Sequence, residues 1–133
     1  MLQKIHLLTT GRSEMIKITE QVREAIRQSG ALEGLVTVYC PHTTAGITIN
    51  EGADPDVARD ILLHLDELFP WEHPLYQHGE GNSAAHLKAS TIGASQAIPV
   101  VNGDVSLGTW QAIYFCEFDG PRNRTYLIKV IQG

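Results

Sequence analysis

The sequence predicts a single α+β domain, and three observations support this fold class. The chain has 133 residues, the length of one ordinary domain and enough to bury a substantial core. Hydrophobic residues make up 43% of it and charged residues 19%, which is globular usage and argues against long disordered segments. Segments with strand periodicity alternate with segments of helical periodicity, without internal repeats or linkers. We therefore expect one compact domain over residues 1–133, with about three helices.

The first elements predicted are two strands and a helix. Residues 2–9 mix apolar and β-branched side chains in rough alternation, and residues 14–19 alternate more clearly. From Glu20 onward the apolar side chains recur at helical spacing. Thr19 is placed to cap this helix and Gly30 to follow its last turn, so we expect a helix of about ten residues.

The middle of the chain predicts two more strands and a second helix. Residues 35–40 are strongly β-prone and are followed by a proline, which ends the strand. Residues 47–51 alternate again, and this pattern places Glu51 at the end of an apolar face. Asp54 and the proline after it are typical of a helix start, so a helix is expected from there to Phe69.

The last part of the chain predicts a third helix and three strands. Asn82 or Ser83 is expected to begin the helix, because a short side-chain oxygen can accept the free amides of a first turn. The strands are expected at residues 96–101, 105–118 and 124–131. The second strand is long, and Gly108 is a position where it could bend. One face of that strand is predicted to carry Gln111, Ile113, Phe115, Glu117 and Asp119.

Charge and composition argue against several partners. The net charge is −5 and the ten Lys and Arg residues are dispersed, so no basic tract is present to neutralise a nucleic-acid backbone. The N-terminus does not resemble a signal peptide and no apolar run reaches membrane-spanning length, so we expect no membrane partner and a cytoplasmic location. Cys40 and Cys116 form no C-x-x-C pair and are expected to be buried free thiols.

Functional side chains concentrate between His78 and Ser90. This segment holds two histidines, a carboxylate, an amide, a lysine and two serines, a mixture that packing alone does not require. His86 is expected about one turn inside the third helix, with His78 in the glycine-rich loop before it. Imidazoles beside exposed amides suit a metal, an anion or a metal-bridged phosphate. The alternative is a polar surface loop with solvated histidines.

A second cluster is expected at the turn between the last two strands. Glu117 and Asp119 approach the turn from one side, and Arg122 and Arg124 follow it. These charges could form a salt-bridged hairpin tip or one wall of a pocket that handles phosphate.

Three sequence blocks resemble the YjbQ family. They are HTTAGITINE at residues 42–51, HGEGNSAAH at residues 78–86 and LGTWQAIYFCEFDGPR at residues 107–122. The blocks occur in the order and spacing of that family, and the resemblance spans nearly the entire chain. It implies a single α+β domain with curved, mixed or antiparallel, β-sandwich-like sheets, and it implies a homotrimer.

The resemblance also implies an activity and a metal. The family is described as secondary thiamine-phosphate synthase, a transferase that would join a pyrimidine pyrophosphate to a thiazole phosphate and release pyrophosphate. It further implies a divalent metal, zinc or alternatively magnesium, held by His42, His78 and His86. Three imidazoles are a common zinc set that leaves one position open for water or a phosphate oxygen.

These features lead to one main functional hypothesis and two alternatives. We expect a metal-dependent enzyme acting on a phosphorylated small molecule, with Glu51, Glu117 or Asp119 orienting a ligand or serving as base. The expected ligand contacts are Asn82, Lys88, Ser90, Gln111, Arg122 and Arg124. The alternatives are a metal-assisted hydrolase and a non-catalytic trimeric protein that binds a metal or metabolite. In a trimer, the site could draw His42 from one chain and the His78 loop from another.

Overall fold

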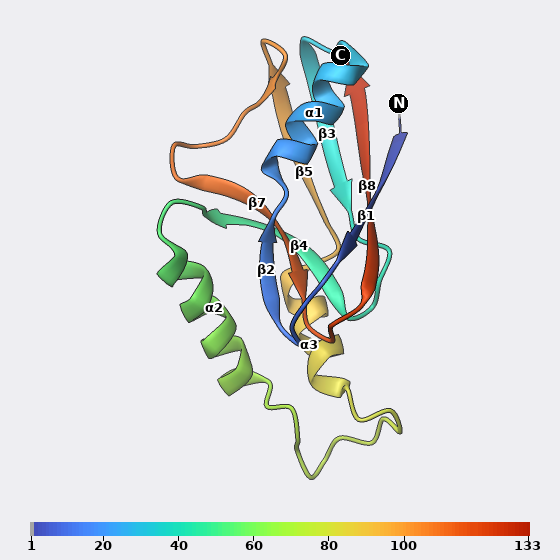
Figure 1. Ribbon diagram of the computed structural model, residues 1–133, viewed down its shortest axis with the longest axis vertical. Helices are drawn as coiled ribbons and strands as arrows, with labels where there is room; N and C mark the ends of the chain where they lie inside the picture. Colours follow the sequence, from blue (N-terminus) through green and yellow to red (C-terminus); the bar gives the residue numbers. More distant parts are fainter. Residues whose placement is uncertain (1) are drawn as a thin grey trace.

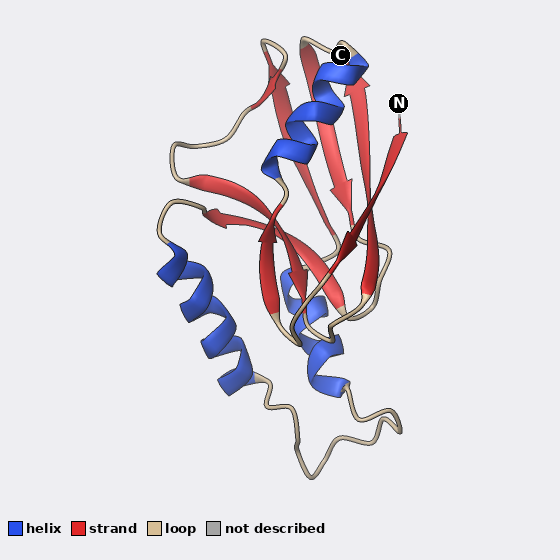
Figure 2. Cartoon of the chain, in the orientation of Figure 1, coloured by secondary structure: helices blue, strands red, loops and turns tan. Residues whose placement is uncertain are grey.

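Residues 2–133 are described by a computed structural model, in which eight strands and three helices build two antiparallel sheets (Figures 1 and 2). The strands are β1 (Leu2–Leu8), β2 (Glu14–Lys17), β3 (Glu33–Tyr39), β4 (Ala45–Glu51), β5 (Ser95–Val101), β6 (Asp104–Val105), β7 (Gln111–Glu117) and β8 (Asn123–Gln132). The helices are α1 (Thr19–Ser29), α2 (Pro55–Leu68) and α3 (Ser83–Ile92). This architecture confirms the predicted single α+β domain.

Each sheet is built mostly from strands that are not consecutive in the sequence. Sheet A has the order β1-β8-β3-β5-β6, and sheet B has the order β2-β7-β4. β7 and β8 follow each other in sequence but are interior strands of different sheets. Figure 1 shows α1 at the end of the molecule that holds both termini, with α2 and α3 towards the opposite end. The turn between β7 and β8 is therefore a junction between the two sheets.

The main hydrophobic core lies among sheet A, sheet B and α1. Val22 and Ile26 of α1 pack in one buried cluster with Val36 of β3, Ile47 of β4 and Phe115 of β7. All five side chains are fully buried, so the amphipathic face of α1 covers sheet A as its sequence period predicts.

A second core lies on the other side of sheet B. Tyr114 and Cys116 of β7 pack there with Leu65 of α2 and Ala85 of α3. Successive β7 side chains thus alternate between the two cores, and this confirms the predicted division of the strand into two faces. The prediction of buried free cysteines is also confirmed, for both Cys40 and Cys116.

Two predicted helix ends are confirmed. Gly30 follows α1 in a left-handed conformation, with φ of 72°, and its N–H donates to the Arg27 carbonyl at 3.1 Å. Asp54 caps α2 by accepting the Asp56 N–H at 2.9 Å, with a proline at the first helical position.

Two predicted side-chain caps are wrong, because both residues bond elsewhere. Thr19 Oγ1 accepts the backbone N–H of Ile113 at 2.9 Å, so it ties α1 to β7. Asn82 does occupy the N-cap position of α3, as predicted, but its Nδ2 donates to Asp119 Oδ2 at 2.8 Å and its side chain makes no capping hydrogen bond. Long-range contacts therefore compete successfully with local capping at these positions.

The predicted single strand over residues 105–118 is wrong. A turn at residues 108–111 separates β6 from β7, closed by a hydrogen bond from Gln111 N–H to the Gly108 carbonyl at 3.1 Å. β6 belongs to sheet A and β7 to sheet B, so the chain changes sheet here instead of bending within one strand.

The outer face of sheet A exposes large apolar side chains. These include Leu2, Leu8, Leu35, Tyr39, Val101 and Ile131. Their positions alternate with half-buried neighbours along β1 and with buried or half-buried neighbours along β3, β5 and β8, so they share the face opposite the core. Within residues 2–133, none of the helices combines the length and apolar character needed to cross a membrane.

Candidate functional site

His78 and His86 lie together at the start of α3. Their ring centroids are 5.3 Å apart, with the planes at 87°, so one imidazole meets the other edge to face. His86 is on the helix and His78 is in the preceding loop, where Gly81 N–H donates to the His78 carbonyl at 3.1 Å. Gly81 has a φ of 75°, a left-handed conformation that glycine adopts without steric cost. This turn brings the loop histidine back to the helical one.

The histidine pair borders two cavities that share His86. The first cavity, of about 530 Å³, is lined by Leu75, Tyr76, Gln77, His78, Ser83, His86 and Leu87. The second, of about 390 Å³, is lined by His42, Thr43, Ala45, His86, Ala89, Ser90, Gly93 and Ala94. The three predicted histidines therefore belong to one region, with His86 between the other two. Tyr76 and Gln77 were missed from sequence because an irregular loop gives no periodic signal.

His42 is held against the backbone of β8. Its Nε2 lies 3.0 Å from the Thr125 amide nitrogen and 3.1 Å from the Thr125 carbonyl oxygen. Burial lowers the pKa of His42 below its ordinary value, and the nearby positive charge of Arg124 lowers it further. A neutral imidazole can accept the Thr125 N–H through Nε2, so His42 supports the join between the β3–β4 connection and β8.

The three histidines do not form a metal-ligand group within the described chain. Residues 2–133 contain no group of three or more His, Cys, Asp or Glu side chains that could hold a metal ion. Within that part of the chain, His42, His78 and His86 therefore do not make the expected three-histidine zinc site. The expectation of a metal-dependent enzyme is wrong on this finding. The metal-assisted hydrolase required the same ligand group and is overturned with it, and so is the metal-binding form of the non-catalytic trimeric protein.

Glu117 and Arg124 form a buried ion pair at the junction of the sheets. Glu117 Oε1 accepts from Arg124 Nε at 2.8 Å and from the Thr9 hydroxyl at 2.7 Å. Arg124 also donates to Thr44 Oγ1 at 2.8 Å. Burial alone would raise the pKa of Glu117, but the Arg124 guanidinium and the Thr9 hydroxyl lower it by more, so this carboxyl stays ionised. These two expected site residues lie against each other inside the fold.

Asp119 connects the histidine loop to the β7–β8 turn. Its Oδ2 accepts from Asn82 Nδ2 at 2.8 Å and from Arg122 Nη2 at 2.9 Å. The Asn82 Oδ1 atom is buried and has no hydrogen-bond partner among residues 2–133. A buried acceptor without a donor costs free energy, so this position suits a bound donor such as water. The charges predicted at the hairpin thus fix the start of α3.

Lys88 and Ser90, the remaining candidates on α3, differ in accessibility. Lys88 is buried and its Nζ donates to Asp66 Oδ1 of α2, so it joins the two helices of the second core. Ser90 is exposed and lines the cavity between His42 and His86. Only Ser90 of this pair faces a cavity.

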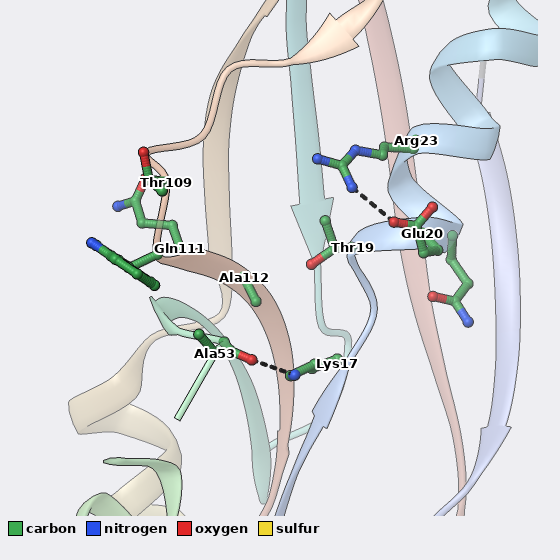
Figure 3. Close-up of a pocket in the computed structure, with 11 residues that line it drawn as sticks. Lys17, Thr19, Glu20, Arg23, Ala53, Thr109, Gln111 and Ala112 are labelled. Carbon is green, nitrogen blue, oxygen red and sulfur yellow. Dashed lines mark hydrogen bonds and ion pairs between the residues drawn. The ribbon is translucent and has the colours of Figure 1, made fainter. Parts of the chain in front are cut away.

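Glu51 and Gln111 lie in a different part of the molecule. Glu51 Oε2 accepts the Ala53 N–H at 2.9 Å and orders the turn after β4. Gln111 Oε1 accepts the Gly108 N–H at 2.8 Å and lines a third cavity with Lys17 and Trp110 (Figure 3). These two candidates therefore line neither histidine cavity.

Comparisons with known proteins identify relatives over almost the whole length. A family model described as "UPF0047 protein YjbQ-like" matches residues 3–133. The UPF0047 protein YugU of Bacillus subtilis is 58% identical over 131 residues, covering 98% of this chain and 99% of the relative. The UPF0047 protein MJ1081 of Methanocaldococcus jannaschii is 48% identical over 133 residues, covering 98% of this chain and 94% of the relative.

Solved structures have the same fold. A protein of the yjbq/upf0047 family from Clostridium acetobutylicum has a TM-score of 0.95 at 54% identity, covering 97% of this chain and 99% of that chain. A YbjQ-like protein from Sulfolobus solfataricus, described as of unknown function, has a TM-score of 0.95 at 31% identity, with coverage of 100% and 97%. None of these names indicates thiamine-phosphate synthase activity, so with the missing metal group the expected activity is overturned.

Proposed function

The chain belongs to the UPF0047 YjbQ-like family, as its sequence resemblance predicted, and we propose that it binds a small phosphorylated molecule directly through His78 and His86. The relatives' names give no ligand, so the proposal is supported by the residues of this chain. Its main support is the pair of imidazoles, 5.3 Å apart, on a cavity at the start of α3.

The chemistry of this cavity suits a phosphate group. An imidazole has at least one N–H donor in each of its protonation states, so two rings can donate to separate phosphate oxygens. The first turn of α3 has no side-chain cap, and a helix N-terminus carries roughly half a positive elementary charge. Ser83, which lines the same cavity, adds a hydroxyl donor.

The shape of the cavity supports a small ligand with an apolar portion. Leu75 and Leu87 line it beside the two imidazoles, and both are exposed in the described chain. A cavity of about 530 Å³ is within the usual range for small-molecule sites. The phosphate would lie at the histidines, and a short carbon skeleton would contact the two leucines.

Assembly into a homotrimer is part of the proposal. The apolar outer face of sheet A supports an interface, because large exposed apolar patches commonly mark contacts between proteins. A divalent metal stays a prediction, and it would need ligands from a second chain, since residues 2–133 of one chain supply no three-ligand group. A cytoplasmic location and the lack of a nucleic-acid partner also stay predictions.

Calorimetric titration with pyrophosphate, in a buffer containing EDTA, tests the binding proposal. The wild type is expected to bind saturably without metal. His78→Gln and His86→Gln should each weaken binding by at least about tenfold, because each removes a phosphate-binding imidazole. His64→Gln is the matched control, since His64 is exposed on α2 and contacts Glu67. Equal affinity in all four proteins would contradict the proposal.

A further inference from the structure

A third cavity, of about 520 Å³, lies away from the histidines. It is bordered by the end of β2, the first turns of α1, the turn after β4 and the segment that leads into β7. Figure 3 shows Lys17 pointing across it towards the turn at Ala53, with Thr109 and Gln111 on one side and Arg23 on the other. The binding proposed above does not use any of these residues.

Trp110 presents an exposed indole on a well-fixed backbone. Trp110 is 65% exposed, which is unusual for so large an apolar residue. The Trp110 carbonyl accepts the Gly52 N–H at 2.8 Å. On the next residue, Gln111 bonds to Gly108 through both its backbone N–H and its side-chain oxygen, at 3.1 and 2.8 Å. These hydrogen bonds fix the backbone of the turn that carries the indole at the edge of the cavity.

Lys17 supplies a cation without an acidic partner. Its Nζ donates to the Gly52 carbonyl, and no carboxylate lies within ion-pair distance of it among residues 2–133. Arg23, by contrast, is paired with Glu20 at 2.7 Å and with Asp104 at 3.1 Å. Of the cavity's cations, Lys17 is thus the one without a carboxylate partner in the described part of the chain, and its ammonium can pair with an anionic group.

We propose that this cavity is a second binding site, for a flat aromatic ring that carries a phosphate or carboxylate group. The ring would stack on the Trp110 indole, and the anion would pair with the Lys17 ammonium. The Gln111 side-chain oxygen accepts from Gly108, and within residues 2–133 no acceptor takes its amide N–H groups, so these can donate to a ring heteroatom. The cavity volume accommodates a ligand as large as a nucleoside monophosphate.

Titration followed by NMR of the tryptophan indole N–H signals tests this site. The chain has two tryptophans, and a Trp71→Phe variant assigns the two signals. Adenosine monophosphate and benzoate are the anionic ring probes, with adenosine and inorganic phosphate as probes that lack the anion or the ring. We expect at least one anionic ring to shift the Trp110 signal saturably, and the responding probe distinguishes a nucleotide site from an aromatic-acid site.

Variants identify the two contacts. Calorimetry measures the affinities, because Trp110→Ala lacks the indole signal. Trp110→Ala and Lys17→Gln should each weaken the binding of the responding probe by at least about tenfold, and both replaced residues are exposed, so the fold should persist. Lys4→Gln, on an exposed residue of β1, is the control and should bind normally. Inorganic phosphate should leave the Trp110 signal unmoved even if it binds at His78 and His86, so the two sites succeed or fail separately.

Three results would overturn this inference. The first is that neither anionic ring shifts the Trp110 signal at millimolar concentration. The second is that Lys17→Gln binds as tightly as the wild type. The third is that Trp110→Ala lowers the mass of the assembly in solution, because the indole would then be covered by a second copy of the chain.

Discussion

Glu117 of β7 and Arg124 of β8 form an ion pair in which both residues are almost inaccessible, at 0% and 5% exposure. β7 belongs to sheet B and β8 to sheet A, so the pair joins the two sheets where the chain passes from one to the other. The Thr9 hydroxyl and the backbone N–H groups of Phe118 and Asp119 also donate to Glu117, and Thr44 Oγ1 accepts from Arg124. Glu117 and Arg124 thus stabilise the junction between sheets A and B.

Replacing Glu117 with glutamine should destabilise the protein by about 3–5 kcal/mol, because it leaves the Arg124 charge buried without a counterion. Urea unfolding of the wild type and the variant measures this difference. Glu24→Gln is the control, since Glu24 pairs with Arg27 on the exposed face of α1 and its replacement should leave the unfolding free energy almost unchanged. A loss for Glu117→Gln as small as for the control would contradict the structural role.

Gly34→Ala should destabilise the fold by about 1–3 kcal/mol. Gly34 has a φ of 151°, and a Cβ atom there would lie 1.9 Å from the Ile131 carbonyl oxygen of the neighbouring strand β8. Thermal unfolding measures the effect. Gly11→Ala is the matched control, because its nearest non-neighbouring atom would be 3.8 Å from the added Cβ. If both variants melt at the wild-type temperature, β3 and β8 are not packed as described.

Asp54→Ala should cost about 1 kcal/mol, because it removes the side chain that accepts the Asp56 N–H at the start of α2. Chemical denaturation measures the loss. Asp60→Ala, an exposed position further along the same helix, separates the cap from a general effect of removing charge. Equal losses at the two positions would argue against the cap.

The free energy of unfolding should decrease as the pH is lowered, and part of this decrease should come from His42. The folded-state pKa of His42 lies below its unfolded value near 6.5, so the unfolded chain binds the proton more readily. The contribution of His42 is therefore present above about pH 6.5 and is lost as the pH falls through the folded-state pKa. The slope from one proton cannot exceed about 1.4 kcal/mol per pH unit. Unfolding of the wild type and His42→Gln at several pH values should show a shallower dependence in the variant; parallel curves would contradict this.

Local sequence patterns predicted the elements well where local physics decides them. The period of α1, its Gly30 end and the Asp54 cap all depend on a few neighbouring residues. The patterns failed where the conformation depends on a residue that is distant in sequence. Thr19 could not be known to bond to Ile113, and alternation over residues 105–118 could not show that the chain changes sheets at Gly108.

The candidate site was predictable in its composition but not in its assembly. The sequence indicated His78 and His86 from their glycine-rich setting, and the structure places their rings together. It also indicated Glu117 and Arg124, because charges near a turn resemble a ligand-binding wall. Whether such charges face a ligand or each other depends on how the two sheets pack, which strand periodicity does not reveal.

The most direct test of the proposed binding is an NMR experiment on the histidine ring nitrogens during titration with pyrophosphate in EDTA. The imidazole signals of His78 and His86 should shift together and saturate, while those of His6 and His64 should stay in place. Unmoved His78 and His86 signals, or an equal drift of the His64 signal, would contradict the proposal that this histidine pair binds phosphate.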